Sequence, residues 1–164
     1  MENTLKQLDE FGFSNYMRIV ASKNGVETHA TPWIKNKVVL SANNGRNLIL
    51  QALSGDYTDP MDITHGEIGT GTTAPTDNDT ATETPVARAQ IAYAGVSGNV
   101  LTIKFFISDA NLTDDTYTEF TSWINGTATI GTGGLFNRLV FSGTPYVKAS
   151  DEDSTIEIRC TLTG

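Results

Sequence analysis

Short runs in which apolar and polar residues alternate recur along this chain, and turns rich in glycine and asparagine separate them. Successive side chains of a strand point to opposite faces of a sheet, so an alternation with a period of two predicts strands with one buried face. Asn24-Gly25 and Ser97-Gly98-Asn99 also predict two β-hairpins, because asparagine and glycine tolerate a positive φ. The predicted strands are residues 16–21, 26–30, 62–69, 86–94, 100–107, 116–123, 135–141 and 155–162.

One segment has the apolar spacing of a helix. Residues 46–53 place Leu48, Ile49, Ala52 and Leu53 on one stripe ahead of Gly55, and glycine commonly follows the last turn of a helix. Ser41 can cap the start of this helix, although the poor helix formers at residues 43–45 can delay the start to Asn44. Many strands with a single helix predict a mostly β fold, namely an antiparallel β-sandwich with one short α-helix packed on it. The richness in threonine and the 15 glycines favour the same fold class, since threonine suits strands and glycine suits turns.

The length of 164 residues suits a single β-sandwich domain with its own core, which we assign to residues 16–164. Residues 1–15 precede it as an N-terminal arm or short helix. Two interpretations of this arm stay open: it docks on a neighbouring molecule, or it folds onto its own domain. The apolar side chains of the arm are Leu5, Leu8, Phe11 and Phe13.

The net charge of -8 and the isoelectric point near 4.6 limit the choice of partners. A nucleic-acid backbone or an anionic membrane surface repels such a chain at neutral pH, so we expect neither as a partner. No run approaches the roughly 20 apolar residues that span a membrane, and no secretory leader is recognisable. Cys160 is the single cysteine, which excludes an internal disulfide, and its alternating surroundings predict a core position.

Residues 69–74 match the glycine pattern of a dinucleotide-binding turn, but Pro75 follows at once. A pyrophosphate needs the amino end of a helix there, and a proline disfavours helical backbone in the residue before it. His29 and His65 lack the spacing to a second ligand that a helical metal site requires. We therefore expect a protein that is not an enzyme and has no cofactor. An irregular calcium site at residues 77–79 stays open as an alternative.

The remaining candidates for function are contact residues. Residues 70–84 are a long irregular segment, and a loop of that length in a compact domain usually serves a function. Trp33 and Trp123 lie near the predicted ends of strands, where an aromatic side chain can anchor an interface, although packing in the core is the alternative. The predicted interface residues are Leu5, Leu8, Phe11, Phe13, Trp33, Thr72, Thr73, Pro75 and Trp123.

A set of short motifs occurs in a fixed order: Val38-Val39-Leu40, Gly45-Arg46-Asn47-Leu48-Ile49, Ile68-Gly69-Thr70-Gly71-Thr72-Thr73-Ala74-Pro75, Asp79-Thr80, Glu83-Thr84-Pro85-Val86-Ala87-Arg88, Thr118-Glu119-Phe120, Gly134-Leu135-Phe136 and Arg138-Leu139-Val140-Phe141. In these motifs the chain resembles a family of small virion structural proteins of tailed bacteriophages, with tail-fibre-like and decoration-like members. The resemblance extends over residues 38–164. It departs from the family at residues 119–123, where members often have Glu-x-Gly-Leu-Phe.

This resemblance implies a virion component, made in the cytoplasm of the bacterial host, that acts through contacts with other virion proteins. A tail, baseplate or fibre-attachment component is the first expectation, and a capsid decoration protein of the head is the alternative. A subunit whose function is its contacts also leads us to expect a homo-oligomer, either a trimer or a ring. A further alternative is a host-surface carbohydrate-binding module, in which Trp33, Trp123 and Tyr117 form a stacking platform.

Overall fold

The computed structural model describes residues 12–40, 44–58 and 61–163 of the chain. Outside these residues lie the predicted interface residues Leu5, Leu8 and Phe11 and the predicted helix cap Ser41. The helical elements are α1 (Arg46–Leu53) and the 3-10 turn η1 (Asp109–Asn111). The strands are β1 (Gly12–Lys23), β2 (Val26–Ala30), β3 (Ile34–Lys35), β4 (Lys37–Val38), β5 (Ile63–Gly69), β6 (Pro85–Ser97), β7 (Val100–Ile107), β8 (Thr116–Tyr117), β9 (Glu119–Ile124), β10 (Gly134–Val140), β11 (Tyr146–Val147) and β12 (Asp153–Thr163).

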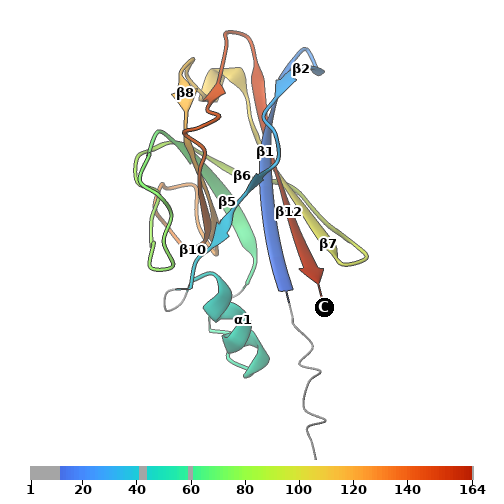
Figure 1. Cartoon of the computed structure of the whole chain (residues 1–164), viewed down its shortest axis with the longest axis vertical. Helices are drawn as coiled ribbons and strands as arrows, with labels where there is room; N and C mark the ends of the chain where they lie inside the picture. The colour runs from blue at the N-terminus through green and yellow to red at the C-terminus, as the bar shows by residue number, and fades with distance from the viewer. Residues whose placement is uncertain (1–11, 41–43, 59–60, 164) are drawn as a thin grey trace, which may run out of the picture.

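The main sheet has 10 strands and is strongly curled, with the order β2-β1-β12-β7-β6-β5-β9-β10-β4 and with β3 attached to β1. β6 connects its two layers, because its first half pairs with β5 and its second half with β7. On the opposite side β3 pairs with β1 and β4 with β10, so residues 34–38 join the two ends of the sheet. The result is the sandwich-like, mostly β fold that the sequence predicted, with α1 at one end (Figure 1).

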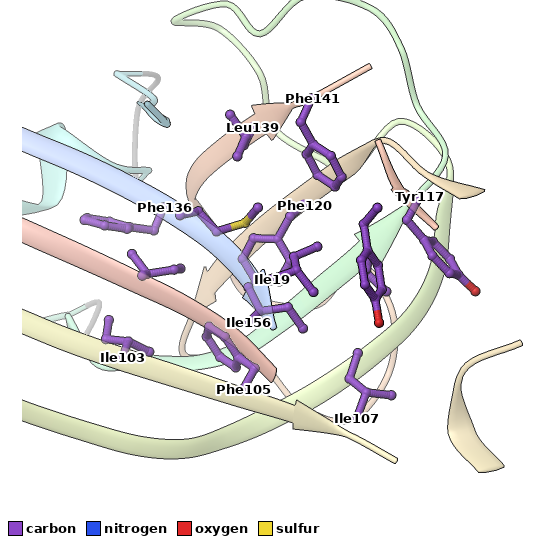
Figure 2. Packing of buried hydrophobic residues seen from close by; sticks show 14 of the residues in the cluster. Ile19, Ile103, Phe105, Ile107, Tyr117, Phe120, Phe136, Leu139, Phe141 and Ile156 are labelled. Atoms are coloured by element: carbon purple, nitrogen blue, oxygen red, sulfur yellow. The ribbon is translucent and has the colours of Figure 1, made fainter. Parts of the chain in front are cut away.

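The core fills the space between the two layers (Figure 2). Its side chains include Ile19 of β1, Phe105 of β7 and Ile156 of β12 from one layer, which meet Phe120 of β9 and Leu139 of β10 from the other. The ring centroids of Phe105 and Phe120 lie 5.6 Å apart, so the two layers are in direct aromatic contact at this point. Burying each of these side chains contributes about 1.5–3 kcal/mol to the free energy of folding.

Cys160 lies in this core, which confirms its predicted position. The side-chain amide of Asn15 donates to its sulfur atom at 3.0 Å. Burial raises the pKa of the Cys160 thiol to about 12. The thiol is therefore protonated at neutral pH and packs as a small apolar group.

The turns form where the sequence predicted them, and the helix begins at Arg46, two residues later than the latest predicted start at Asn44. Asn24 and Gly25 have φ values of 52° and 78° in the hairpin of β1 and β2, and β6 and β7 form the second predicted hairpin. Gly45 precedes α1 with a φ of 47°. A Cβ atom at Gly45 would lie 2.1 Å from the carbonyl oxygen of Val39, so only glycine fits at the start of the helix.

The buried face of α1 is narrower than its apolar stripe indicated. Of the four residues of the stripe, Leu48 is buried, Ile49 and Ala52 are half-buried, and Leu53 is 80% exposed. The helix lies at the end of the sandwich where β1 begins (Figure 1), so only its nearest side chains meet the strands. Within the described residues, no helix has the length and apolarity needed to cross a bilayer.

Residues 116–123 do not form the single alternating strand that the sequence predicted. The run divides into β8, which pairs with β11, and β9, which pairs with both β5 and β10. Every residue of β9 is buried, because its outer face is covered as well as its inner face. Glu119 and Thr121 point to this outer side, where they hydrogen-bond with residues 82–84.

Candidate functional site

Residues 70–84, between β5 and β6, form the long irregular loop that the sequence predicted. We call it the clamped loop, because charged side chains hold it against the sheet. It is the green segment along one side of the molecule in Figure 1. Thr72 and Thr73 are exposed on this loop and Pro75 is half-buried, so the three predicted interface residues lie at or near the surface.

The centre of the clamp is Arg138, which extends from β10 and is almost entirely buried. Its Nε atom lies 2.7 Å from Oε1 of Glu119 on β9. Its Nη1 atom lies 2.9 Å from Oδ2 of Asp79, and its Nη2 atom lies 3.0 Å from Oε2 of Glu83, both in the clamped loop. Burial alone would lower the pKa of Arg138, but hydrogen bonds to Asp79 and Glu119 raise it, so the guanidinium keeps its charge.

All three carboxylates around Arg138 also accept hydrogen bonds from the loop itself, and Asp79 accepts the main-chain N–H and the hydroxyl of Thr76. Glu119 accepts the main-chain N–H groups of Glu83 at 2.8 Å and of Thr84 at 3.1 Å. Glu83 accepts the main-chain N–H of Thr73 at 2.9 Å and its hydroxyl at 2.7 Å, and these bonds hold the pKa of Glu83 below its usual range. Both ends of the loop are thus tied to one cluster of charges.

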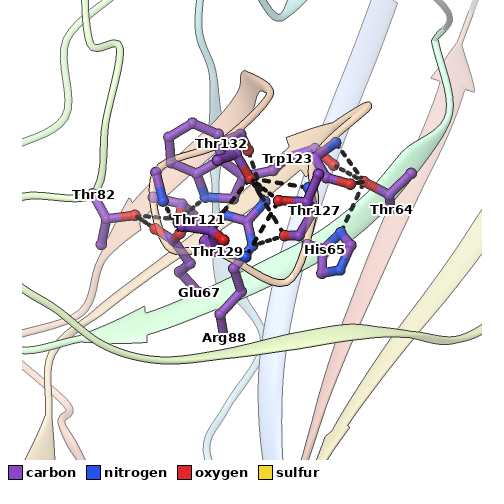
Figure 3. A network of polar contacts seen from close by, with 12 residues as sticks. Thr64, His65, Glu67, Thr82, Arg88, Thr121, Trp123, Thr127, Thr129 and Thr132 are labelled. Atoms are coloured by element: carbon purple, nitrogen blue, oxygen red, sulfur yellow. Dashed lines mark hydrogen bonds and ion pairs between the residues drawn. The ribbon is translucent and has the colours of Figure 1, made fainter.

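A second buried ion pair fixes the end of the clamped loop and a neighbouring turn (Figure 3). Glu67 of β5 and Arg88 of β6 are opposite each other in the sheet, and Nη1 of Arg88 donates to Glu67. The other carboxylate oxygen of Glu67 accepts the hydroxyl of Thr82. Arg88 donates to two carbonyl oxygens in residues 127–132, each at 2.7 Å, and lies over the ring of Trp123, 5.3 Å from its centroid.

The carboxylates of the alternative calcium site face cations of the chain itself. Asp77 lies 3.0 Å from Nη2 of Arg46 and 3.2 Å from Nζ of Lys37. Asp79 pairs with Arg138, as described above. In the described part of the chain, no group of three or more histidine, cysteine, aspartate or glutamate side chains is arranged to hold a metal ion.

The two histidines lie on different strands and in different surroundings. His65 of β5 is buried, and burial together with the charge of Arg88 lowers its pKa, so the ring is neutral at pH 7. His29 of β2 is exposed, with Nδ1 3.7 Å from Oε1 of Glu152 and its ring stacked 5.6 Å from that of Tyr146. Nδ1 of His65 lies 3.1 Å from the hydroxyl oxygen of Thr64, so each histidine has a local structural partner.

The two tryptophans differ in burial. Trp123 is 1% exposed and belongs to a small core cluster, so its prediction as an interface residue is wrong and the core alternative is correct. The reason is that β9 is covered on both faces. Trp33 is half-buried, and its ring centroid lies 4.9 Å from the guanidinium of Arg18 and 4.5 Å from that of Arg159. Trp33 stays a predicted interface residue.

The stacking platform expected for a carbohydrate-binding module is not formed. Tyr117 is fully buried and its ring stacks on that of Tyr146 at 6.3 Å. With Trp123 buried as well, Trp33 is the one partly exposed ring of the expected three. Phe13 is half-buried and meets the ring of Phe136 edge-on at 6.3 Å, so it packs at the margin of the core.

The charged residues of the clamp were not identified from the sequence. Glu67, Arg88, Glu119 and Arg138 each occur within a run that has the pattern of a strand. A charged residue inside a strand-like run is the one sequence feature that could have indicated the clamp, because a charge in a buried strand has to be paired. The partners are far apart in the chain, and Arg138 lies 59 positions after Asp79, so spacing alone does not pair them.

Comparison of the chain with protein-family models, with curated proteins and with solved structures found no match.

Several of the motifs noted in the sequence lie close together in the structure. Arg46 of one motif pairs with Asp77 in the clamped loop, and Arg138 of another pairs with Asp79. Arg88, from a third motif, holds the neighbouring turn. Segments that are distant in the chain therefore build one unit, the clamped loop and its supports.

Proposed function

We propose that this protein is a structural subunit of a tailed-bacteriophage virion, a tail, baseplate or fibre-attachment component that acts through contacts with other virion proteins. It is made in the cytoplasm of the bacterial host and functions in the assembled particle. The observation that supports this most directly is the pairing of Arg138 with three carboxylates, which presents a long surface loop in a fixed shape. The motifs that resemble the phage family fall on the same loop and on its supports.

A loop held in one conformation is suited to forming contacts. Fixing a flexible side chain on binding costs about 0.5–1.5 kcal/mol, which reduces the affinity of a mobile surface. In this protein the ion pairs order the clamped loop in the unbound chain, and Thr72 and Thr73 are exposed on it. Identical copies then offer identical contact surfaces, as a symmetric assembly requires.

The proposal includes self-association into a trimer or a ring, which light scattering after size-exclusion chromatography measures directly. Thr72→Arg adds a charge to the exposed loop, and we expect it to shift the protein toward smaller species. Val96→Arg is the matched control, because Val96 is 75% exposed near the tip of the β6–β7 hairpin. A stable monomer that neither substitution alters contradicts the self-association.

The location in the particle is tested separately. Virions of a phage that encodes the chain are dissociated gently, and mass spectrometry then follows the chain in the head and tail fractions. We expect it in the tail fraction. Recovery with heads supports the capsid decoration alternative instead, and absence from purified virions refutes the virion assignment.

A further inference from the structure

The outer surface of the layer built from β1, β12 and β7 carries aromatic and basic side chains. Met17, Ile158 and Ile103 pair with one another across these strands and point into the core. Because successive side chains of a strand point to opposite sides, the residues next to these three point outward. Trp33 lies on the same side, since two outward guanidinium groups lie over its ring. We call this surface the basic face, and its residues are Tyr16, Arg18, Trp33, Lys35, Lys104 and Arg159.

The basic face is positively charged although the whole chain carries a charge of -8. Glu157 lies between Arg18 and Lys104, 2.6 Å from each, and neutralises one of the two. Arg159 and Lys35 are exposed, and neither forms an ion pair with a described residue. Four cations and one carboxylate leave a net charge of +3 on this surface. The basic face therefore attracts a negatively charged partner.

The residue types of the basic face favour a protein as that partner. Tyrosine, tryptophan and arginine contribute most to binding at protein interfaces. Tyr16 is 40% exposed here, and the guanidinium of Arg159 lies 4.5 Å from the ring centroid of Trp33. Stacked bases of a single-stranded nucleic acid could also fit such a surface. The rest of the chain has a charge of -11, because the total is -8, and this charge repels a phosphate backbone.

Negative charge gathers at the end of the sandwich around β8, opposite α1 (Figure 1). Asp109 and Asp114 have side chains that are 42% and 48% exposed, and they share one buried cation, Lys148. Asp115 is exposed and forms no ion pair with a described residue. We call Asp109, Asp114 and Asp115 the acidic end. Three carboxylates with one cation leave this end with a net charge of -2.

The basic face and the acidic end of one copy cannot meet each other. Asp153 adjoins the acidic end, because its carboxylate accepts the main-chain N–H of Asp109 at 2.9 Å. Arg159 follows six residues later in the same strand, β12, which separates the two by about 20 Å. A contact between these two surfaces therefore requires a second copy of the chain.

We infer that the acidic end of one copy docks on the basic face of the next copy. The carboxylates of the acidic end pair with Arg159 and Lys35, next to the ring of Trp33. The two surfaces differ, so the contact is head-to-tail, and successive copies form a ring when the rotation between them closes. This inference rests on the proposed self-association and specifies the surfaces that produce it.

The clamped loop lies beside the same contact. The hydroxyl of Thr118 donates to the carbonyl oxygen of Gly71 at 2.9 Å, and Asp115 precedes Thr118 by three residues. Thr72 therefore lies near the margin of the acidic end. The contact at the acidic end and the contact proposed for the loop thus belong to one continuous surface.

Charge reversal on each surface tests the inference, with the molar mass measured by light scattering after size-exclusion chromatography. Arg159→Glu and Asp115→Arg each change an exposed side chain. Each should raise the dissociation constant of the assembly at least about tenfold, because like charges then face each other. Asp56→Arg is the matched control, since Asp56 is exposed just after α1, at the other end of the molecule, and it should leave the molar mass unchanged.

An equimolar mixture of the two charge-reversed variants is the decisive measurement. The reversed face of Arg159→Glu then meets the reversed end of Asp115→Arg, and the unchanged end of the first meets the unchanged face of the second. The mixture should therefore form heavier species than either variant alone. A mixture that stays as small as its components contradicts the head-to-tail contact, and so does unchanged association of both single variants.

A fluorescent oligothymidine titrated into the wild type tests the other class of partner. We expect no binding at physiological ionic strength. Binding that Arg159→Glu abolishes assigns the basic face to nucleic acid and overturns the inference. A monomeric wild type overturns it as well, together with the self-association. Unchanged association of both single variants removes this contact alone, and the dissociation of virions tests the proposed function independently.

Discussion

Glu67 and Arg88 face each other across β5 and β6 and form an ion pair whose side chains are 0% and 2% exposed. Each partner has further hydrogen bonds. Glu67 accepts from the hydroxyl of Thr82 and from the N–H of Gly131, and Arg88 donates to two carbonyl oxygens in residues 127–132. An ion pair in such a place adds little net stability over apolar residues, but removing one partner leaves a buried charge unpaired. The pair therefore fixes the geometry of two loops, and its loss is expected to be severe.

The first prediction concerns this pair. Arg88→Met should lower the free energy of unfolding by about 3–5 kcal/mol, because Glu67 is then buried without a cation. Adding Glu67→Leu to Arg88→Met should recover part of the loss, since no lone charge remains. Urea denaturation of the wild type, both single variants and the double variant measures the coupling. Additive losses in the double variant would falsify the role of a mutually dependent pair.

The second prediction concerns the clamp. Arg138→Met should release the clamped loop, because Asp79, Glu83 and Glu119 then repel one another without their shared cation. Hydrogen exchange should accelerate at the main-chain N–H groups of Glu83 and Thr84, which donate to Glu119 in the folded protein.

The control for the clamp is Arg46→Met, since the side chain of Arg46 is 45% exposed in its pair with Asp77. An exposed pair contributes about 0–1 kcal/mol, so the loop should stay protected in this variant. Equal exchange at Glu83 and Thr84 in the Arg138 variant and in the wild type contradicts the clamp.

The third prediction concerns the contact between the layers. A Cβ atom at Gly66 would lie 2.7 Å from Cζ of Phe120 and 3.1 Å from Cδ2 of Phe105. Gly66→Ala should therefore destabilise the protein by about 1–3 kcal/mol through overpacking. Gly143→Ala is the matched control, because nothing lies within 4 Å of its added Cβ, and it should be neutral or slightly stabilising. Thermal unfolding compares the midpoints of the Gly66→Ala and Gly143→Ala variants. Equal midpoints refute the close packing of Gly66 against the rings of Phe120 and Phe105.

The fourth prediction is a loss of stability in acid. Hydrogen bonds from Thr73 lower the pKa of Glu83, and for Asp79 the bonds from Thr76 and Arg138 outweigh burial, which raises its pKa. Such carboxylates bind fewer protons in the folded than in the unfolded chain. Their stabilisation is therefore complete above the unfolded values, near 3.8 for Asp and 4.5 for Glu, and is lost as the pH falls through the lower folded values.

Urea denaturation at stepped pH checks this expectation. The free energy of unfolding should fall slightly between pH 7 and about 5.5, because His65, whose pKa is lowered in the folded protein, binds a proton more readily in the unfolded chain. It should fall more steeply below about pH 4.5, where the carboxylates are protonated. Asp79→Asn removes one of the linked groups and should reduce the slope of that fall. The same slope in the variant and the wild type contradicts the linkage of Asp79 to folding.

The local features of the fold could be predicted from the sequence because local chemistry determines them. Asn24-Gly25 specifies a hairpin through its positive φ values, and Gly55 follows the predicted helix, which ends at Leu53. The alternation of Leu101, Ile103 and Phe105 likewise matches their inward position on β7. None of these features depends on a distant segment.

The remaining features depend on pairing between distant segments. Trp123 is buried because β9 lies between β5 and β10 beneath a loop, and the alternation of residues 116–123 contains no sign of that cover. Arg138 pairs with Glu83, which lies 55 positions earlier in the chain. From the sequence alone, an arginine in a strand is equally compatible with a position on the surface. The closing segment at residues 34–38 is too short for any periodicity.

That closing segment has a consequence for which backbone groups of the sheet are open to other chains. Its backbone pairs with β1 on one side and with β10 on the other. The backbone groups of β1 and β10 at these positions are therefore not available for pairing with a strand of another molecule. Backbone pairing is indifferent to sequence and leads readily to disordered polymerisation when many copies are crowded together. Contacts with another molecule at the closing segment therefore depend on the shape and charge of side chains, which can distinguish a correct partner from an incorrect one.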